Sequence, residues 1–320
     1  MSAAIDKPGK PDQEIEPIVT NGSMTLLSDG GTALLTLRLG SVSQRNWSRI
    51  ASALTEAPFP GAQDDRVFIK QFVDAGGVAH EVQWDFEREG AELAGRLFGE
   101  TITVPRLLHA DRDHLLHVYE HVEMLSIDDL LRGDPARLER LFPPLLEALR
   151  GVLALLDSAT ASVATSALTV KNRPYGGAST AVNFKGMDIR NVGLRLPTQK
   201  DSVALTMFDF GRPYLAPLEE AGAKLFVSIG MLNWGRPLHR FVRGPDQALL
   251  QRASAALGDY LDCDSVLAEI DYQQRIRESD VKAANPITLA LKTFGLRTIG
   301  RGYLRRLAAW SKENLAQANQ

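Results

Sequence analysis

The order of hydrophobic patterns along the chain most limits what it can fold into. The first 122 residues hold several short strand-like runs and one long helical run, whereas the rest is mostly helical with a few short strands. Asp29-Gly30-Gly31 separates the apolar runs 24–28 and 32–40, and Asp-Gly favours a hairpin because such a turn needs positive φ. An antiparallel sheet with one helix, followed by a helical half, is an α+β arrangement with two lobes.

The first lobe, predicted for residues 19–122, contains the clearest individual elements. A strand is predicted over residues 66–73 and a long helix over residues 81–98, which carries Trp84. Two further strands are predicted over residues 105–109 and 115–121. A short helix is also expected over residues 43–56, because three apolar side chains are spaced to share one helical face: Trp47, Ile50 and Leu54.

The second lobe, predicted for residues 123–320, should be mainly helical. Ser126 is expected to cap a helix that begins at Ile127, and residues 138–158 form a strongly apolar helix in which Pro143-Pro144 could introduce a break. Residues 159–180 are small and polar and are expected to form a loop or insertion. Residues 1–18 are expected to form a disordered tail.

Composition excludes several classes of protein. The net charge of −3 gives no overall case for nucleic-acid binding, and the single cysteine, Cys263, rules out a disulfide framework and a cysteine zinc site. No run of about 18 apolar residues is present, so no membrane span is expected. These features favour a cytoplasmic protein.

Four short segments that carry polar residues stand out for their order along the chain. Lys70 lies near the end of an apolar strand, and the following helix carries Glu87, Glu89 and Glu92. Far downstream, Asp188-Ile189-Arg190-Asn191 is followed, after two strand-like runs, by Asp209-Phe210-Gly211. A strand lysine paired with a helix glutamate, an asparagine after a loop and an Asp-Phe-Gly are the groups with which kinases hold ATP and magnesium.

On these residues the chain resembles the protein-kinase-like superfamily, and especially its small-molecule branch of aminoglycoside phosphotransferases and lipopolysaccharide kinases. The resemblance implies the nucleotide ATP and the cofactor Mg²⁺. It implies that Lys70 binds the phosphates and is held by Glu89, with Glu87 and Glu92 as rivals that spacing does not exclude. It also implies that Asn191 and Asp209 bind the metal.

The segment Tyr119 to Met124 fits a hinge between lobes in this resemblance. Backbone groups near Glu120 and Val122 would then meet the edge of the adenine ring. No GxGxxG phosphate loop is present, and Ser28 to Thr32 is the segment that could replace it.

The catalytic loop departs from the resemblance. Such kinases place a catalytic aspartate five residues before the metal asparagine, and here that residue is Gly186. Asp188 precedes Asn191 by three residues and is the candidate base; the alternatives are that Asp188 helps to bind metal or that the base is missing.

Two hypotheses from different classes follow. The leading one is an ATP- and Mg²⁺-dependent phosphotransferase acting on a hydroxyl of a small molecule or glycan, with the acceptor near the insertion, Trp234 and His239. The alternative is a pseudokinase that serves as a nucleotide-binding or partner-binding scaffold. The basic, amphipathic C-terminal stretch, residues 287–315, is interpreted as a packed helix with a solvated face; contact with an anionic membrane or an acidic partner is the other interpretation.

Overall fold

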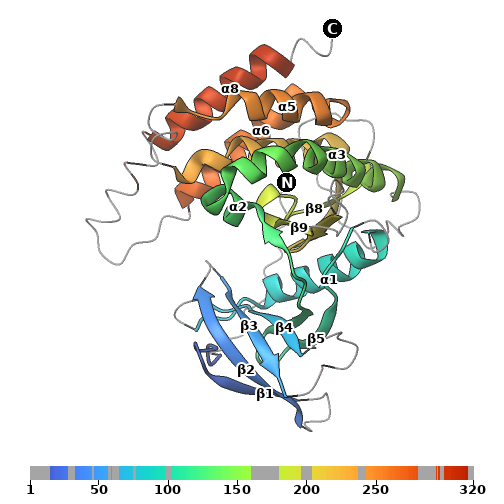
Figure 1. Ribbon diagram of the computed structural model, residues 1–320, viewed down its shortest axis with the longest axis vertical. Coiled ribbons are helices and arrows are strands. Elements are labelled where there is room, and N and C mark those ends of the chain that lie inside the picture. The colour runs from blue at the N-terminus through green and yellow to red at the C-terminus, as the bar shows by residue number, and fades with distance from the viewer. Residues whose placement is uncertain are drawn as a thin grey trace, which may run out of the picture. The chain divides into compact units, whose positions relative to one another are not determined.

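The computed structural model describes most of the chain and divides it into two compact units (Figure 1). The first unit comprises residues 1–96 and 104–123, and the second comprises residues 97–103 and 124–320. The described residues are 15–27, 33–44, 47–56, 59, 65–74, 77–98, 102–159, 180–195, 204–236, 243–279, 293, 295 and 299–315.

The first unit is built on a six-stranded antiparallel sheet with the order β1-β2-β3-β4-β6-β5 (Figure 1). Its strands are β1 (Ser23–Leu27), β2 (Ala33–Gln44), β3 (Arg49–Thr55), β4 (Arg66–Gln71), β5 (Leu107–Asp111) and β6 (Leu116–Glu120). Alternate residues of β4 and β6, such as Val67, Ile69 and Val118, enter the main apolar core of the unit. Lys70 and His117 are directly paired across these strands and therefore face the other side of the sheet.

The helix predicted over residues 81–98 is confirmed as α1 (Glu81–Phe98). Its indole Trp84 packs with Phe72 and Leu115, and the Trp84 Nε1 donates a hydrogen bond to the carbonyl oxygen of Leu116 at 3.4 Å. The segment 97–103, which had been assigned to the first lobe, belongs to the second unit, where Phe98 contacts Phe184.

The predicted helix over residues 43–56 is wrong, because residues 43 and 44 belong to β2 and residues 49–55 form β3. In β3 the buried residues alternate at Ala51, Ala53 and Thr55, whereas Leu54 is 50% exposed. The helical spacing of Trp47, Ile50 and Leu54 was therefore misleading, since small residues at a spacing of two supply the buried face.

The end of the predicted disordered tail is also corrected. Residues 1–14 lie outside the described part of the chain, but Ile15 and Ile18 are buried in the first unit. The Gln71 side chain accepts a hydrogen bond from the Ile18 amide at 2.9 Å and donates one to the Glu16 carbonyl at 3.0 Å. Arg49 donates to the Ile18 carbonyl at 2.8 Å, so residues 15–18 form an N-terminal strap over the sheet.

The second unit is mainly helical and carries two small antiparallel sheets. One sheet has the order β10-β9-β7 and the other pairs β11 with β8; the strands are β7 (Leu125–Ser126), β8 (Thr180–Phe184), β9 (Val192–Arg195), β10 (Ala204–Met207) and β11 (Pro213–Pro217). The helices are α2 (Ile127–Gly133), α3 (Pro135–Ala159), α4 (Leu218–Gly230), α5 (Gln247–Leu257), α6 (Cys263–Ser279) and α8 (Arg301–Leu315). Short 3-10 turns are η2 (Ile189–Asn191), η3 (Leu232–Gly235) and η5 (Gly258–Tyr260).

Two of the helix predictions in the second unit are confirmed, and two elements were not predicted. Ser126 caps α2 by accepting a hydrogen bond from the Asp129 amide, and α3 continues through Pro143-Pro144 without a break in helix assignment. The pattern did not predict β11 or α6.

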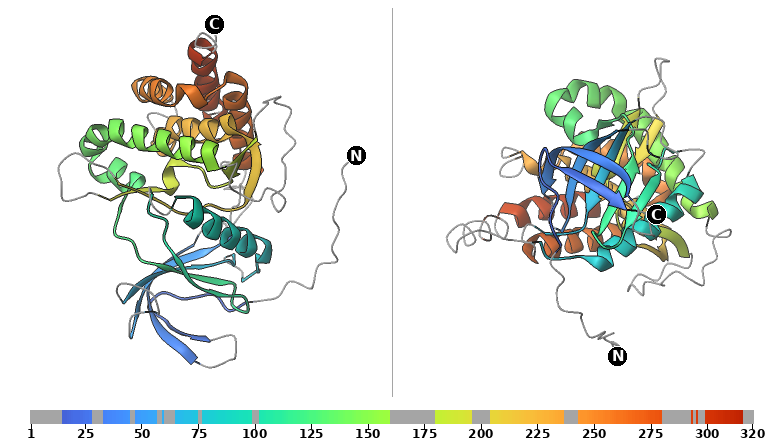
Figure 2. Two further views of the ribbon diagram at one scale, coloured as in Figure 1. Left: turned by 90° about the vertical axis from the view of Figure 1, so that its right-hand side faces the viewer. Right: turned by 90° about the horizontal axis from the view of Figure 1, so that it is seen from below.

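The helix α4 is the centre of the second unit. It packs against α3, α5 and α6, and all its residues except Glu219 are buried. A β-carbon at Gly222 would lie 2.0 Å from the Tyr260 carbonyl oxygen, so glycine permits this close approach. Figures 1 and 2 both show α8 lying against the neighbouring C-terminal helices, and Tyr303 of α8 donates a hydrogen bond to the Gly230 carbonyl at 2.6 Å.

Candidate functional site

Lys70 of β4 forms a buried ion pair, but with Glu87 and not with Glu89. Its Nζ lies 3.4 Å from Glu87 Oε1, and the two side chains are 9% and 6% exposed. Glu89 is exposed on another face of α1. The prediction that Glu89 is the partner of Lys70 is therefore wrong. Successive helical residues are about 100° apart, so Glu89, two positions after Glu87, points about 200° away from it around α1.

The side of the sheet around this pair is aromatic and holds a neutral histidine. Lys70 Nζ lies 5.2 Å from the centre of the Phe72 ring, and His117 Nδ1 lies 3.0 Å from the Tyr119 hydroxyl. Burial, with a smaller effect from the positive charges of Lys70 and Arg88, lowers the pKa of His117 to about 3. His117 is therefore uncharged at neutral pH, and Glu87 supplies the charge that compensates Lys70.

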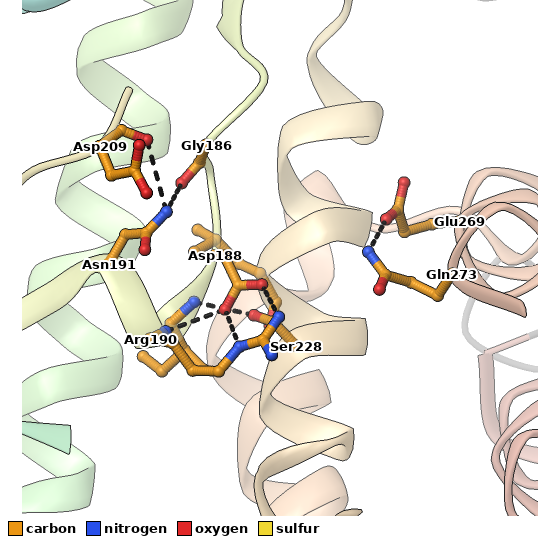
Figure 3. A network of polar contacts seen from close by, with 10 residues as sticks. Gly186, Asp188, Arg190, Asn191, Asp209, Ser228, Glu269 and Gln273 are labelled. Atoms are coloured by element: carbon orange, nitrogen blue, oxygen red, sulfur yellow. Dashed lines mark hydrogen bonds and ion pairs between the residues drawn. The ribbon is translucent and has the colours of Figure 1, made fainter. Parts of the chain in front are cut away.

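In the second unit, Asn191 brings the two predicted metal-binding segments together (Figure 3). Its Nδ2 donates to the Gly186 carbonyl at 2.9 Å and lies 3.4 Å from the Asp209 carbonyl. The backbone supports this arrangement, since the Gly186 amide donates to Phe210 at 2.8 Å and the Phe208 amide donates to Asn191 at 3.1 Å. Both hydrogens of the amide are directed at carbonyls, which fixes the orientation of the Asn191 side-chain oxygen.

Asp209 has an uncommon backbone conformation. Its φ is +58°, in the left-handed region, and Gly211 follows with a φ of +59°. A non-glycine residue in this region carries local strain, which proteins tend to retain at functional sites. The conformation turns the Asp209 carbonyl toward Asn191 and Gly186.

The donor chemistry of Asn191 and Asp209 fits a magnesium ion. Mg²⁺ prefers oxygen ligands and is held in proteins by one or two side chains, with water and phosphate oxygens completing its shell. Within the described part of the chain, no group of three or more histidine, cysteine, aspartate or glutamate residues is placed to hold a metal ion. Asn191 and Asp209 contribute one side-chain amide oxygen and one carboxylate of this kind.

Gly186 occupies the position where a catalytic aspartate was expected, and that position is closed. A β-carbon at Gly186 would lie 1.7 Å from the Asp209 carbonyl oxygen and 3.0 Å from the Phe210 carbonyl carbon. The loop is therefore remodelled around glycine, because the two backbone segments touch where a side chain would begin.

Asp188 caps the η2 turn and binds the side chain of Arg190 (Figure 3). Its Oδ1 accepts from the Arg190 amide at 2.9 Å and from Arg190 Nε at 2.9 Å, and its Oδ2 pairs with Arg190 Nη2. This hydrogen-bonded pairing raises the pKa of Arg190. The Asp188 side chain is 20% exposed, so it remains partly accessible.

The predicted hinge residues lie at the end of β6. The Glu120 amide donates to the Arg106 carbonyl at 2.9 Å, and its carboxylate forms a two-pronged pair with Arg106 at 2.9 and 3.2 Å. This pairing raises the pKa of Arg106. Val122 is partly buried outside any helix or strand, and adenine contact by Glu120 and Val122 stays a prediction.

Several predicted features lie outside the described residues: the substitute phosphate loop (28–32), all but the two end residues of the insertion predicted over 159–180, and His239. Trp234 is described and packs against Tyr303 with ring centres 5.3 Å apart, and the Arg277 guanidinium lies 5.0 Å from the centre of the Trp234 ring.

The C-terminal helix α8 buries its apolar face, which comprises Tyr303, Leu304, Leu307 and Leu315. Arg305 and Lys312 are exposed, while Arg301 pairs with Glu278 at 2.8 Å. In the described residues 301–315, the structure agrees with a packed helix bearing a basic outer face. No described helix is both long and apolar enough to cross a membrane.

The sequence named Glu87 as a rival partner of Lys70 but did not select it, although it lies three residues after Trp84 and four before Ala91, on the buried face of α1. Two other polar residues were missed by sequence reasoning. Lys224 and Ser228 of α4 contact the loop around Gly186. They also have a signal, since they interrupt an otherwise apolar helix at a spacing of four residues.

Comparisons with known proteins found similarity in structure alone. No protein-family profile matches the sequence, and no curated protein sequence matches it. Among solved structures, aminoglycoside 2'-phosphotransferase-IIIa in complex with GDP is similar with a TM-score of 0.47 and 12% identity, covering 87% of this chain and 93% of that one. A variant of the same enzyme with GDP gives a TM-score of 0.49 and 13% identity over 88% and 94% of the two chains.

An ethanolamine kinase from Plasmodium vivax is similar with a TM-score of 0.43 and 8% identity, covering 83% of this chain and 84% of that one. All three similarities are distant, with TM-scores below 0.5, so function has to be argued from the residues of this chain.

Proposed function

We propose that this protein is a kinase-type phosphotransferase that uses ATP with Mg²⁺ and acts on a hydroxyl group of a small molecule or glycan. The observation that carries the proposal is the arrangement of Asn191 and Asp209. These residues lie 18 positions apart in the sequence, and a side-chain amide fixes one against the backbone of the other. Their oxygen chemistry suits a metal that bridges phosphates.

Each remaining residue has a role that follows from its contacts. Lys70, compensated by Glu87, would contribute a positive charge toward the nucleotide phosphates, and Glu120 and Val122 would meet the adenine edge. Bound Mg²⁺ would neutralise charge that develops on the phosphates during transfer. Asp188 would orient the acceptor hydroxyl, with its carboxylate held in place by Arg190.

A second candidate function is a pseudokinase scaffold, which two observations favour. At the position of the expected base, Gly186, the Asp209 backbone leaves no room for a side chain. Asp188 already caps a turn and pairs with Arg190. Such a protein would bind nucleotide or a partner without transferring phosphate. A measurement of phosphate transfer distinguishes the two functions, because only the phosphotransferase would transfer phosphate.

Metal-dependent nucleotide binding is required by the phosphotransferase and is shared only by a scaffold that binds nucleotide. Titration of the protein with Mg·ATP, followed by calorimetry and by thermal stability, should show stabilisation that grows with ligand concentration. Asp209→Asn is expected to weaken the magnesium-dependent binding at least about tenfold while preserving the fold, because asparagine tolerates positive φ and lacks the negative charge. Binding that is the same for both proteins would remove Asp209 from the metal site.

Turnover tests the role of Asp188. Asp188→Asn keeps the cap of η2, because asparagine is an equally good cap, but removes the basic group. If Asp188 acts as the base, the variant should bind Mg·ATP normally and transfer phosphate about 10²- to 10⁴-fold more slowly. Arg190→Gln is the matched control, since it removes the other half of the ion pair and leaves the carboxylate. Equal rates for Asp188→Asn and the parent would assign Asp188 to the cap alone.

A further inference from the structure

The polar residues of α4 form an unusual pattern for a buried helix. Three of its four polar side chains, Glu220, Lys224 and Ser228, recur at intervals of four residues and therefore share one face. These side chains are 2%, 6% and 7% exposed, and the other buried residues of α4 are apolar or glycine. We call Glu220, Lys224 and Ser228 the α4 ladder. Burying polar groups is costly unless they are hydrogen-bonded, so the hydrogen bonds of the ladder show which segments it holds in place.

Two residues of the ladder, Lys224 and Ser228, bind the two ends of the loop that contains Gly186. Lys224 Nζ donates to the Phe184 carbonyl at 3.1 Å, at the last residue of β8. Ser228 Oγ accepts from the Ile189 amide at 2.9 Å, at the first residue of η2. The residues between these two anchors, 185–188, are the loop itself.

The ladder also holds the strand that follows Asp209. Lys224 Nζ contacts the hydroxyl of Tyr214, which also donates to Glu220, and Lys224 lies 3.5 Å from Glu220 Oε1. Tyr214 belongs to β11, where it pairs with Asn183 of β8. A single helix face therefore anchors both chain segments that lead to the candidate metal residues.

We propose that Glu220, Lys224 and Ser228 are positioning residues that set the orientation of the Asn191 amide oxygen for metal binding. This inference rests on the proposed function, because it assigns the ladder to the metal site of that reaction. The Asn191 amide contacts one carbonyl from each anchored segment, Gly186 and Asp209. A shift of either segment along α4 would rotate the amide, and displacements of about 1 Å can cost on the order of 100-fold in activity.

The test uses Ser228→Ala, which removes the acceptor of the Ile189 amide. Hydrogen exchange of the Ile189 amide in the free protein should become about tenfold faster or more, because its buried partner is lost. The apparent Mg²⁺ affinity in the presence of ATP should fall by about tenfold, whereas binding of ATP without metal should be unchanged. Ser228→Thr, which restores the hydroxyl, should recover both properties.

Ser254→Ala is the matched control. Ser254 lies in α5 and donates to the carbonyl three residues earlier, at 3.0 Å, as Ser228 does at 2.8 Å, but the structure shows no hydrogen bond from it to the loop. The control should alter neither exchange at Ile189 nor the Mg²⁺ dependence. Tyr214→Phe provides a second variant, which keeps the ring and removes the contacts to Lys224 and Glu220; it should weaken the Mg²⁺ dependence in the same direction.

The outcomes separate this inference from the proposed function. If the parent protein binds Mg·ATP and Ser228→Ala binds it equally well, the positioning role is overturned and the proposed function stands. If Ser228→Ala changes exchange at Ile189 but the parent shows no metal-dependent binding, the proposed function fails, and the ladder anchors the loop without serving a metal. Unchanged exchange at Ile189 would overturn the ladder itself.

Discussion

Glu87→Gln should destabilise the first unit strongly, because it removes the carboxylate charge that lies 3.4 Å from the buried Lys70 ammonium. At 3.4 Å the attraction between two unit charges is about 5 kcal/mol for an effective dielectric constant of about 20. Breaking a buried ion pair from one side costs about 3–5 kcal/mol, and glutamine keeps the shape and some hydrogen bonding. We therefore expect a loss of about 3 kcal/mol in the free energy of unfolding.

The control is Glu89→Gln, which makes the same chemical change two residues further along α1. Glu89 is exposed, so the expected change in the free energy of unfolding lies within about 0.5 kcal/mol. Urea unfolding can be followed by fluorescence in a Trp234→Phe/Trp310→Phe background. Trp47 and Trp84 then remain as the reporters, and both lie in the first unit.

A double variant isolates the pair. Lys70→Met combined with Glu87→Gln should cost less than the sum of the single changes, because no buried charge is left uncompensated. Equal effects of Glu87→Gln and Glu89→Gln, or strict additivity in the double variant, would refute the assignment of Glu87 as the partner of Lys70.

Two further predictions follow from close packing and from a shifted pKa. Gly186→Ala should destabilise the second unit by several kcal/mol and disturb Mg²⁺ binding, since its β-carbon would meet the Asp209 carbonyl. Gly151→Ala in α3 has open space and should stabilise by about 0.5–1 kcal/mol; both changes are measured by urea unfolding reported by Trp234 and Trp310, which lie in the second unit. His117 takes up a proton below pH 6.5 when unfolded but only near pH 3 when folded, so its contribution to stability is complete above pH 6.5 and is lost as the pH falls toward 3. His117→Phe should remove about 2 kcal/mol of the difference in unfolding free energy between pH 7 and pH 5, while the control His121→Gln retains it; identical pH dependence of the parent and His117→Phe would contradict this.

The sequence predicted the larger elements of the fold because their signals are local. The α1 boundaries and the Ser126 cap depend on periodicity and on capping chemistry that act within a few residues. Residues 43–56 were misassigned because the buried face of β3 consists of small residues, while Leu54 is exposed. Which face of such a segment is buried is decided by the strands on either side of it, which a local pattern does not contain.

The candidate site was predicted in part for a similar reason. Residue types and their order located Lys70, Asn191 and Asp209, but not the partner of Lys70. Helical geometry could have selected Glu87 over Glu89, since only Glu87 continues the buried stripe of α1. The closure at Gly186 could not be predicted, because it arises from contact with a backbone segment more than twenty residues away.

The N-terminal strap has a practical consequence for the boundaries of recombinant versions of this protein. A version that begins at residue 19 would lack the Ile18 amide that donates to Gln71 Oε1 and the Glu16 carbonyl that accepts from Gln71 Nε2, and would keep only the His114 carbonyl at 3.3 Å. Gln71 is fully buried next to Lys70. It would also remove the carbonyl that receives Arg49. Removal of residues 15–18 would thus destabilise β4 beside Lys70, on which nucleotide binding is proposed to depend. Inactivity of such a truncated protein would therefore not be evidence against the proposed reaction.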